Sequence, residues 1–211
     1  VEFDLSPSDT VLERRYTRLP FVPEDSRTLD ERCELILKMQ CMGLKKRLSH
    51  TGAAKAVVGI SGGLDSSLAL IVCALAMKEL SRPASDILAV TMPCFGTTDR
   101  TYDNACQLSN TLGVTLEEID IREAVRIHFR DIKQDESNHN VTYENGQARE
   151  RTQILMDIAN RENGLVIGTG DMSELALGWA TYNGDHMSMY GVNAGVPKTL
   201  VRHLVRYYAD T

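Results

Sequence analysis

Short apolar runs alternate along the chain with longer segments in which apolar residues recur at helical spacing. Residues 56–60 (AVVGI) form a continuously apolar run, which is typical of a strand buried in a parallel sheet. Residues 68–80 follow as a segment that is apolar nearly all round and has the length of a helix. The same alternation predicts further strands at 86–92, 114–121 and 165–168 and further helices at 101–112, 122–132, 147–160 and 172–177. Because strand and helix alternate four times, we predict an α/β fold with a doubly wound parallel sheet.

The segments outside this alternation are predicted as an arm, helices and loops. Residues 1–28 are polar and irregular, which indicates a linker, and a helix is expected from residue 29 to about residue 50. The other segments are predicted as loops at 133–143 and 178–195 and a last helix at 198–208. Because the sequence begins with Val1 rather than Met and ends directly after a helical pattern, we expect a fragment of a longer protein, with its globular domain at 29–211.

Composition and charge exclude several classes of protein. A length of 211 residues with 43% hydrophobic and 25% charged residues is ordinary for one globular domain. The net charge of −6 argues against a dedicated nucleic-acid binder. The longest apolar stretch, residues 68–77, is too short to span a membrane. The five cysteines include no C-x-x-C pair, which argues against a zinc ribbon, and reduced cysteines fit a cytoplasmic protein.

A glycine- and serine-rich segment follows the first predicted strand, within the stretch VVGISGGLDSSL at 57–68. Gly62 and Gly63 permit positive φ and a close approach of a ligand to the backbone. Exposed backbone N–H groups at the start of the next helix then form an anion site. Asp65 would repel a phosphate in such a cradle unless a cation lay between them, so this residue predicts Mg²⁺. The alternative is a plain strand-to-helix turn in which Asp65 and Ser66 cap the helix.

A second glycine turn follows the strand predicted at 165–168, at the start of the stretch GTGDMSELALGWATYNGDHMSMYGVNAGVPK. Thr169 is placed to reach a nucleotide, and Glu174 is a candidate second magnesium ligand or substrate contact. Trp179 and Tyr182 are candidates for stacking on an aromatic ring. Alternatively, Trp179 is a core anchor and Glu174 a solvated helix residue. Further polar groups in this stretch are Asp171, Asp185 and His186.

The SGGLDS sequence at 61–66 resembles the pyrophosphate loop of the N-type ATP pyrophosphatases. Members of that superfamily cleave ATP to AMP and pyrophosphate while they adenylylate a substrate oxygen. The stretch 165–198, together with 143–160 (YENGQARERTQILMDIAN) and 91–99 (TMPCFGTTD), closely resembles NAD synthetase, particularly the long glutamine-dependent type. This resemblance covers about residues 20–208. It implies a Rossmann-like three-layer sandwich of the adenine nucleotide alpha-hydrolase-like type. It also implies that the domain at 29–211 is truncated at its C-terminus.

The resemblance also implies an activity and its partners. The family converts deamido-NAD to NAD at the expense of ATP, through an adenylylated intermediate, and releases AMP and pyrophosphate. The implied cofactors are ATP, as a co-substrate, and Mg²⁺. Ammonia is expected from a glutaminase domain that precedes residues 1–28 in the long family members. A homo-oligomer, at least a dimer, is expected, with neither nucleic acid nor membrane as a partner.

Site residues are implied by the same resemblance. The catalytic residues are expected to be Asp65, Lys198 and Asp185, the last as a proton acceptor for ammonia, and the metal ligands Asp65 and Glu174. ATP is expected to contact Gly59, Ile60, Ser61, Gly62, Gly63, Leu64, Asp65, Ser66, Thr91, Met92, Thr169 and Lys198. Deamido-NAD is expected to contact Asn145, Glu174, Trp179, Ala180, Thr181, Tyr182 and Asp185. Arg149 and Arg151 are expected either to meet substrate phosphates or to face solvent.

Two other classes of protein remain open. One is a different adenylylating enzyme such as GMP synthetase, which lacks the sequence GTGDMSELALGW. The other is a non-catalytic nucleotide-binding module of the same fold. Such a module would tolerate the loss of Asp65 or Lys198, and both are present.

Overall fold

The computed structural model of the chain describes residues 9, 11, 13–96 and 98–211. The helices are α1 (Ser26–Thr51), α2 (Leu64–Glu79), α3 (Asp99–Leu112), α4 (Arg122–Ile132), α5 (Val141–Arg161), α6 (Met172–Leu177) and α7 (Lys198–Asp210), with a short 3-10 helix η1 (Ala84–Asp86). The strands are β1 (Lys55–Gly59), β2 (Ile87–Thr91), β3 (Thr115–Glu118), β4 (Gly164–Gly168) and β5 (Tyr190–Gly191).

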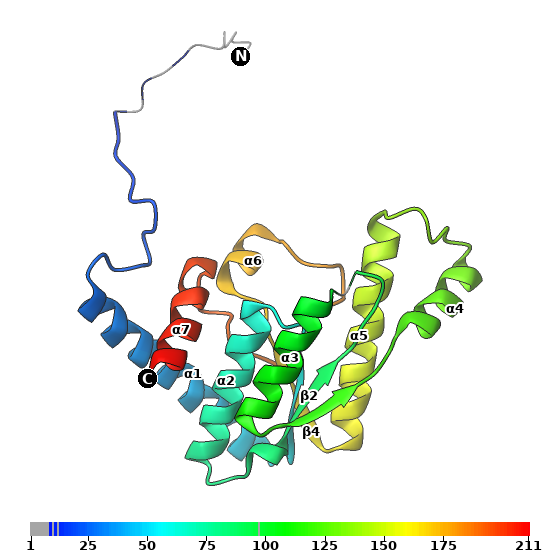
Figure 1. Cartoon of the computed structure of the whole chain (residues 1–211), viewed down its shortest axis with the longest axis horizontal. Helices are drawn as coiled ribbons and strands as arrows, with labels where there is room; N and C mark the ends of the chain where they lie inside the picture. Colours follow the sequence, from blue (N-terminus) through cyan, green and yellow to red (C-terminus); the bar gives the residue numbers. More distant parts are fainter. Residues whose placement is uncertain (1–8, 10, 12, 97) are drawn as a thin grey trace.

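In the described part of the chain, these strands form one parallel sheet with the order β3-β2-β1-β4-β5. Helices cover both faces of the sheet, α1, α2, α3 and α7 on one side and α4 and α5 on the other (Figure 1). Each face has its own apolar core. Leu44, Leu68 and Leu204 belong to the first core, while Val90 and Phe129 belong to the second. The structure thus confirms the predicted three-layer, doubly wound α/β fold.

The sheet order places a topological switch point between β1 and β4. The chain runs from β1 outward through β2 to β3, and then returns to the other side of β1 to form β4. Because the two connections diverge, a crevice opens beyond the carboxyl ends of β1 and β4, where doubly wound sheets bind their ligands. Both glycine-rich segments begin there, since one follows Gly59 at the end of β1 and the other follows Gly168 at the end of β4. The fold therefore brings the two sequence motifs to one edge of the sheet.

The loop after β1 is shorter than predicted, because α2 begins at Leu64 rather than at residue 68. Gly63 is the N-cap of α2, so Asp65 and Ser66 lie in the first helical turn. Of the two glycines that permit positive φ, Gly62 has it, with φ 76°, whereas Gly63 is extended with φ −83°. A Cβ atom on Gly62 would lie 1.9 Å from the carbonyl oxygen of Thr101, so the loop after β1 approaches the backbone of α3 too closely for any side chain at this position.

Helix α5 begins before the position that apolar periodicity predicted, and it absorbs the end of the loop predicted at 133–143. Asn140 is the N-cap, and its side-chain oxygen accepts a hydrogen bond from the N–H of Tyr143 at 3.1 Å. The first turns carry few apolar residues, which is why periodicity missed them. Asn145 consequently lies on a helix rather than next to a loop.

Two further element bounds differ from the predicted ones. Helix α1 begins at Ser26 because the Asp25 carboxylate caps it, accepting the N–H of Thr28 at 2.8 Å. Strand β5 lies within the segment 178–195 that was predicted as a loop. Its two residues pair with the edge of β4 that faces away from β1, and a strand of this length is too short to produce a pattern.

Neither a disulfide nor a helix able to span a membrane is found in the described part of the chain. All five cysteines lie in the described part of the chain and form no disulfide with one another. Burial raises the pKa of the Cys73 thiol well above its ordinary value. Among the described helices, none is both long and apolar enough to cross a membrane.

Candidate active site

A cleft of about 1000 Å³ lies at the carboxyl ends of the strands, where the switch point was located. It is lined by residues from the loop after β1, the end of β2, helix α5, the end of β4 and the segment after α6. The predicted site residues that line it are Gly59, Ile60, Ser61, Gly63, Asp65, Ser66, Thr91, Met92, Asn145, Thr169, Glu174, Trp179, Ala180, Thr181, Tyr182 and Asp185. The other three, Gly62, Leu64 and Lys198, are not among its lining residues. Leu64 and Lys198 line a second cavity of about 310 Å³ that shares Asp65 with the cleft.

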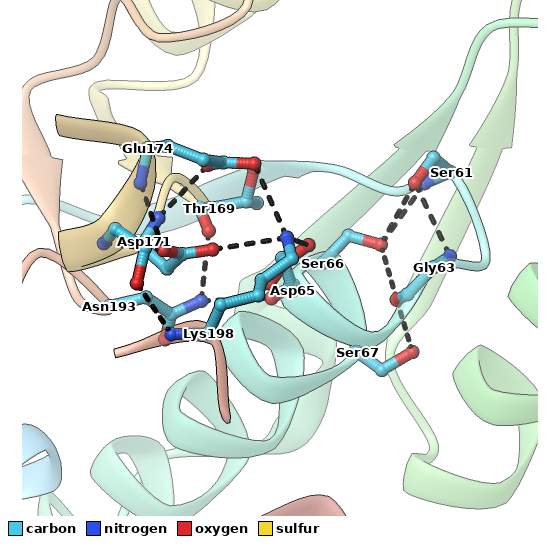
Figure 2. A network of polar contacts seen from close by, with 11 residues as sticks. Ser61, Gly63, Asp65, Ser66, Ser67, Thr169, Asp171, Glu174, Asn193 and Lys198 are labelled. Carbon is cyan, nitrogen blue, oxygen red and sulfur yellow. Dashed lines mark hydrogen bonds and ion pairs between the residues drawn. The ribbon is translucent and has the colours of Figure 1, made fainter. Parts of the chain in front are cut away.

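The hydroxyl groups of the serine-rich loop bond within the loop itself (Figure 2). The N–H of Ser61 donates to Ser66 Oγ at 3.3 Å, and the N–H of Gly63 donates to Ser61 Oγ at 3.3 Å. Ser66 Oγ and Ser67 Oγ both donate to the carbonyl oxygen of Gly63, at 3.1 and 2.8 Å. These bonds hold the turn in shape. They do not involve Asp65, so the alternative in which Asp65 caps the helix is not the arrangement observed.

Asp65 instead belongs to a cluster of three carboxylates, which we call the carboxylate cluster: Asp65, Asp171 and Glu174. Oxygen atoms of the three side chains lie within 4.8 Å of one another. The ammonium group of Lys198 lies among them (Figure 2), with Nζ at 2.6 Å from Asp65 Oδ2, 3.0 Å from Asp171 Oδ2 and 3.3 Å from Glu174 Oε1. The predicted catalytic pair Asp65 and Lys198 is thus in direct contact, although the two residues are 133 positions apart.

The carboxylates set the ionisation of this lysine. Burial by itself lowers the pKa of Lys198, but hydrogen bonds to Asp65 and Asp171 and the charges of Asp65 and Glu174 outweigh it. The pKa of Lys198 therefore lies well above its ordinary value. Lys198 carries a positive charge at any physiological pH, which suits it to contact an anion rather than to exchange a proton.

Asp171 is a member of the site that the sequence analysis counted only as a further polar group. It is fully buried, and its Oδ1 accepts the N–H groups of Ser173 at 2.7 Å and Glu174 at 3.1 Å. Glu174 Oε2 accepts the N–H of Asp171 at 3.1 Å in return, which completes a capping box at the start of α6. The Asp-x-x-Glu spacing at 171–174 was the feature of the sequence that could have identified this capping box, and with it Asp171 as a member of the site. The capping box turns Asp171 Oδ2 and Glu174 Oε1 toward Lys198.

The carboxylate cluster fits a divalent cation. Asp65 Oδ1 is buried and has no hydrogen-bond partner among the described residues. Three carboxylates offering oxygen atoms at short range are the donor set that Mg²⁺ prefers in proteins. Asp65 and Glu174, the two predicted metal ligands, are both in the cluster, and Asp171 adds a third.

The segment after α6 is held against helix α5 by two arginines. Arg151 forms an ion pair with Asp185, with its Nε at 3.2 Å from Oδ1 and its second nitrogen at 3.2 Å from Oδ2. Arg149 donates to the carbonyl oxygen of Tyr182 at 3.2 Å. Neither arginine is simply a solvated helix residue, and Asp185 is paired with a guanidinium in this arrangement.

The aromatic residues of this segment are exposed rather than packed in the core. Trp179 is 78% exposed and Tyr182 is 73% exposed, although both line the cleft. The alternative in which Trp179 is a core anchor is therefore wrong. Both rings are accessible to a ligand.

A second residue that the sequence analysis missed is Asn193, which is fully buried between β4 and α2. Its Nδ2 donates to the carbonyl oxygens of Asp65 at 2.9 Å and Thr169 at 3.0 Å. Gln40 of α1 donates through Nε2 to Asn193 Oδ1 at 3.1 Å and to the carbonyl oxygen of Val192 at 2.9 Å. No sequence pattern marks these two amides.

A parallel sheet with a glycine- and serine-rich loop after β1 and an acidic cluster at the switch point is the Rossmann-like arrangement of the ATP pyrophosphatases. The NAD synthase family profile matches residues 36–209, so the chain belongs to the NAD synthase family. This result confirms the resemblance stated from the motifs, and it disfavours GMP synthetase.

Curated relatives and solved structures agree with this family. The chain is 49% identical to the glutamine-dependent NAD(+) synthetase of Mycobacterium leprae and 48% identical to that of Mycobacterium tuberculosis. Each alignment covers 98% of this chain and 32% of the relative, so the chain spans about a third of the relatives' length. The glutamine-dependent NAD+ synthetase of Acinetobacter baumannii, solved with ADP, superposes with a TM-score of 0.77 at 30% identity, over 83% of this chain and 32% of that one. The NH3-dependent NAD synthetase of Campylobacter jejuni superposes with a TM-score of 0.74 at 27% identity, over 83% of this chain and 73% of that one.

Proposed function

We propose that this chain carries the synthetase site that amidates deamido-NAD to NAD, using ATP and ammonia and releasing AMP and pyrophosphate. The observation that carries the proposal is the contact of Lys198 with the carboxylate cluster, beside a phosphate-type loop at the mouth of the switch-point crevice. Membership in the NAD synthase family and the ADP bound to the Acinetobacter baumannii relative support it.

ATP lies, in this proposal, along the loop after β1 with its adenine end toward Thr91 and Met92. The backbone N–H groups at the start of α2 offer a partial positive charge to the phosphates. Lys198 adds a full positive charge next to them. Thr169, across the crevice at the end of β4, lines the same cleft and completes the nucleotide side.

Asp65 and Glu174, with Asp171, would hold Mg²⁺, which when bound offsets negative charge on the phosphates and polarises them. The protein contributes the placement of these ligands. Asp65 comes from the first turn of α2, whereas Asp171 and Glu174 come from the capping box of α6. The two parts meet only because β1 and β4 are neighbours in the sheet.

The deamido-NAD end of the site is formed by α5 and the segment after α6. Asn145 lines the cleft from the second turn of α5, and exposed Trp179 and Tyr182 line the same cleft from the segment after α6. Arg149 and Arg151 hold that segment in place through Tyr182 and Asp185. A site of this kind binds the pyridine end by ring contacts and orients it by polar contacts.

The chemistry proceeds in two steps. An oxygen of the nicotinate carboxylate attacks the α-phosphorus of ATP, the bond to the β-phosphate oxygen breaks, and pyrophosphate leaves. Ammonia then attacks the carbonyl carbon of the resulting mixed anhydride, AMP leaves with the bonding pair, and the nitrogen loses a proton. The protein aligns the reactants and stabilises charge on the leaving groups, which requires fixed donors such as the loop N–H groups and Lys198. The proton-accepting role of Asp185 stays a prediction, as do the glutaminase domain, the linker at 1–28 and the homo-oligomer.

The experiment that tests the proposal compares Asp65→Asn with the wild-type chain. With ATP, deamido-NAD, ammonium and Mg²⁺, the wild type should form NAD, AMP and pyrophosphate, and Asp65→Asn should form AMP about 100-fold or more slowly. Asp86→Asn is the matched control, because Asp86 also pairs with a lysine but lies outside the cleft. Wild-type rates in Asp65→Asn would contradict the proposal. AMP formation with xanthosine monophosphate in place of deamido-NAD would contradict the substrate.

A further inference from the structure

Asn193 lies buried beneath the switch-point crevice, between the first turn of α2 and the end of β4, on the segment between β5 and α7. One amide nitrogen reaches both sides of the crevice, since it donates to the carbonyl oxygen of Asp65 in α2 and to that of Thr169 after β4. Figure 2 shows Asn193 next to Lys198 and the carboxylate cluster. The side chain is fully buried, so no water competes for its donors.

The orientation of this amide is set from the far side by Gln40. Because Gln40 Nε2 donates to Asn193 Oδ1, the amide group of Asn193 must present its nitrogen to the two carbonyl oxygens. Gln40 is itself held by its bond to the carbonyl oxygen of Val192. A chain of two amides thus connects α1 to both halves of the site.

The two carbonyls that Asn193 joins belong to the two halves of the carboxylate cluster. Asp65 supplies one carboxylate, and Thr169 lies two residues before Asp171, which starts the capping box. Lys198 also joins these halves, but its charge is available to phosphates when ATP binds. The Asn193 bonds are neutral and buried, so they persist whichever anions enter the cleft.

We propose that Asn193 is a positioning residue that fixes the separation of Asp65 from Asp171 and Glu174, and that Gln40 orients it. The proposal rests on the proposed function of the cleft and adds a residue to it. A purely structural role would stabilise the fold without affecting ligand affinity or turnover beyond that stabilisation. The two roles therefore differ in Mg²⁺-dependent binding rather than in melting temperature.

The test uses four variants of the whole chain. Asn193→Ala removes both bonds across the crevice. Gln40→Met removes the orienting donor, and Gln40→Glu replaces it with a carboxylate that repels Asn193 Oδ1 and favours the flipped amide. Ser109→Ala is the control, because Ser109 is equally buried and loses one hydrogen bond to the carbonyl oxygen of Ala105 in α3, away from the cleft.

Calorimetry with a non-hydrolysable ATP analogue, with and without Mg²⁺, measures binding independently of turnover. We expect the Mg²⁺-dependent gain in affinity to fall about tenfold in Asn193→Ala, and kcat for AMP formation to fall about 100-fold, the size of effect that a misplacement of about 1 Å produces. Gln40→Glu should lose more affinity and more turnover than Gln40→Met. Ser109→Ala should match the wild type in both measurements, whatever the change in its melting temperature.

Binding and kcat unchanged in folded Asn193→Ala would overturn the positioning role, and equal effects of Gln40→Met and Gln40→Glu would overturn the orienting role. If Asn193→Ala does not fold, the Gln40 pair decides, because wild-type binding in both variants would overturn the proposal. A wild type that binds the Mg²⁺–analogue pair but makes no NAD would refute the proposed function alone, since the binding measurements would still test Asn193.

Discussion

Removal of the Lys198 charge should destabilise the protein in a way that Mg²⁺ reverses. In Lys198→Met the side chain keeps its length and apolar stem but loses the ammonium group that contacts all three carboxylates. The carboxylate cluster then holds up to three negative charges with no protein cation in contact. Asp171 is fully buried and cannot turn toward water without breaking the capping box of α6.

The magnitude follows from the distances. Two unit charges at 4.8 Å, the upper limit within the cluster, repel by about 3 kcal/mol at an effective dielectric constant of about 20. Removal of one partner from a buried ion pair typically costs about 3–5 kcal/mol. Half of the Lys198 side chain is exposed, so water screens part of this effect and we expect about 2–3 kcal/mol. For a domain of this size, that loss lowers Tm by about 5–10 °C.

The assay is thermal unfolding with and without Mg²⁺, at pH 7 and without nucleotide. A cation that binds only the folded state at 100 times its Kd stabilises it by about 2.7 kcal/mol, so millimolar Mg²⁺ should recover most of the Tm lost in Lys198→Met. Lys45→Met is the matched control, because Lys45 pairs with a single carboxylate, Glu79, on the helix surface at 3.3 Å. It should lose less than about 1 kcal/mol, and Mg²⁺ should change its Tm no more than it changes that of the wild type.

Two results would refute this reasoning. A Tm for Lys198→Met equal to that of the wild type would mean that the carboxylates do not depend on the lysine. A Tm that falls as expected but does not rise with Mg²⁺ would mean that the cluster does not accept the cation, and Asp65 and Glu174 would lose their proposed role as metal ligands.

Two further predictions concern the fold around the site. Gly62→Ala should lower the free energy of unfolding by about 2 kcal/mol or more, because Gly62 has φ 76° and an added Cβ would meet the Thr101 carbonyl. Gly52→Ala is the control, because Gly52 has φ 67° and open space around it, and it should lose less in the same denaturant titration. Burial raises the pKa of Asp86, but hydrogen bonds from Lys55 and Arg82 outweigh it and hold the pKa below its ordinary value. The stabilisation by Asp86 is therefore present above about pH 4 and is lost as the pH falls through its folded pKa. Asp86→Asn should thus be less stable than the wild type at pH 7 by about 1 kcal/mol, and this difference should shrink steadily in unfolding measurements toward pH 3; a constant difference would contradict the assignment.

Local features of the sequence were sufficient for the fold class, the order of all the helices longer than one turn and of the first four strands, and the phosphate-type loop. Apolar runs of strand length and segments of helical period reflect which face of each element is buried. Each buried position contributes its own apolar residue to the pattern, so the sequence alone shows it. Helix starts were less well predicted, because capping groups such as Asp25, Gly63 and Asn140 precede the apolar positions that define the period. The motifs also identified the family, since they concern contiguous residues.

The composition of the carboxylate cluster and the support behind it were decided only by the tertiary structure. Asp65 and Lys198 are 133 positions apart, and Gln40 and Asn193 are 153 apart, so no local period or spacing connects them. Their contacts depend on the strand order, which makes β1 and β4 neighbours and folds α7 and the segment before it over the crevice. A buried amide such as Asn193 looks like any loop asparagine in the sequence. Its donors acquire partners only when the ends of two strands meet, because hydrogen-bond geometry is a property of the assembled sheet and not of the residue.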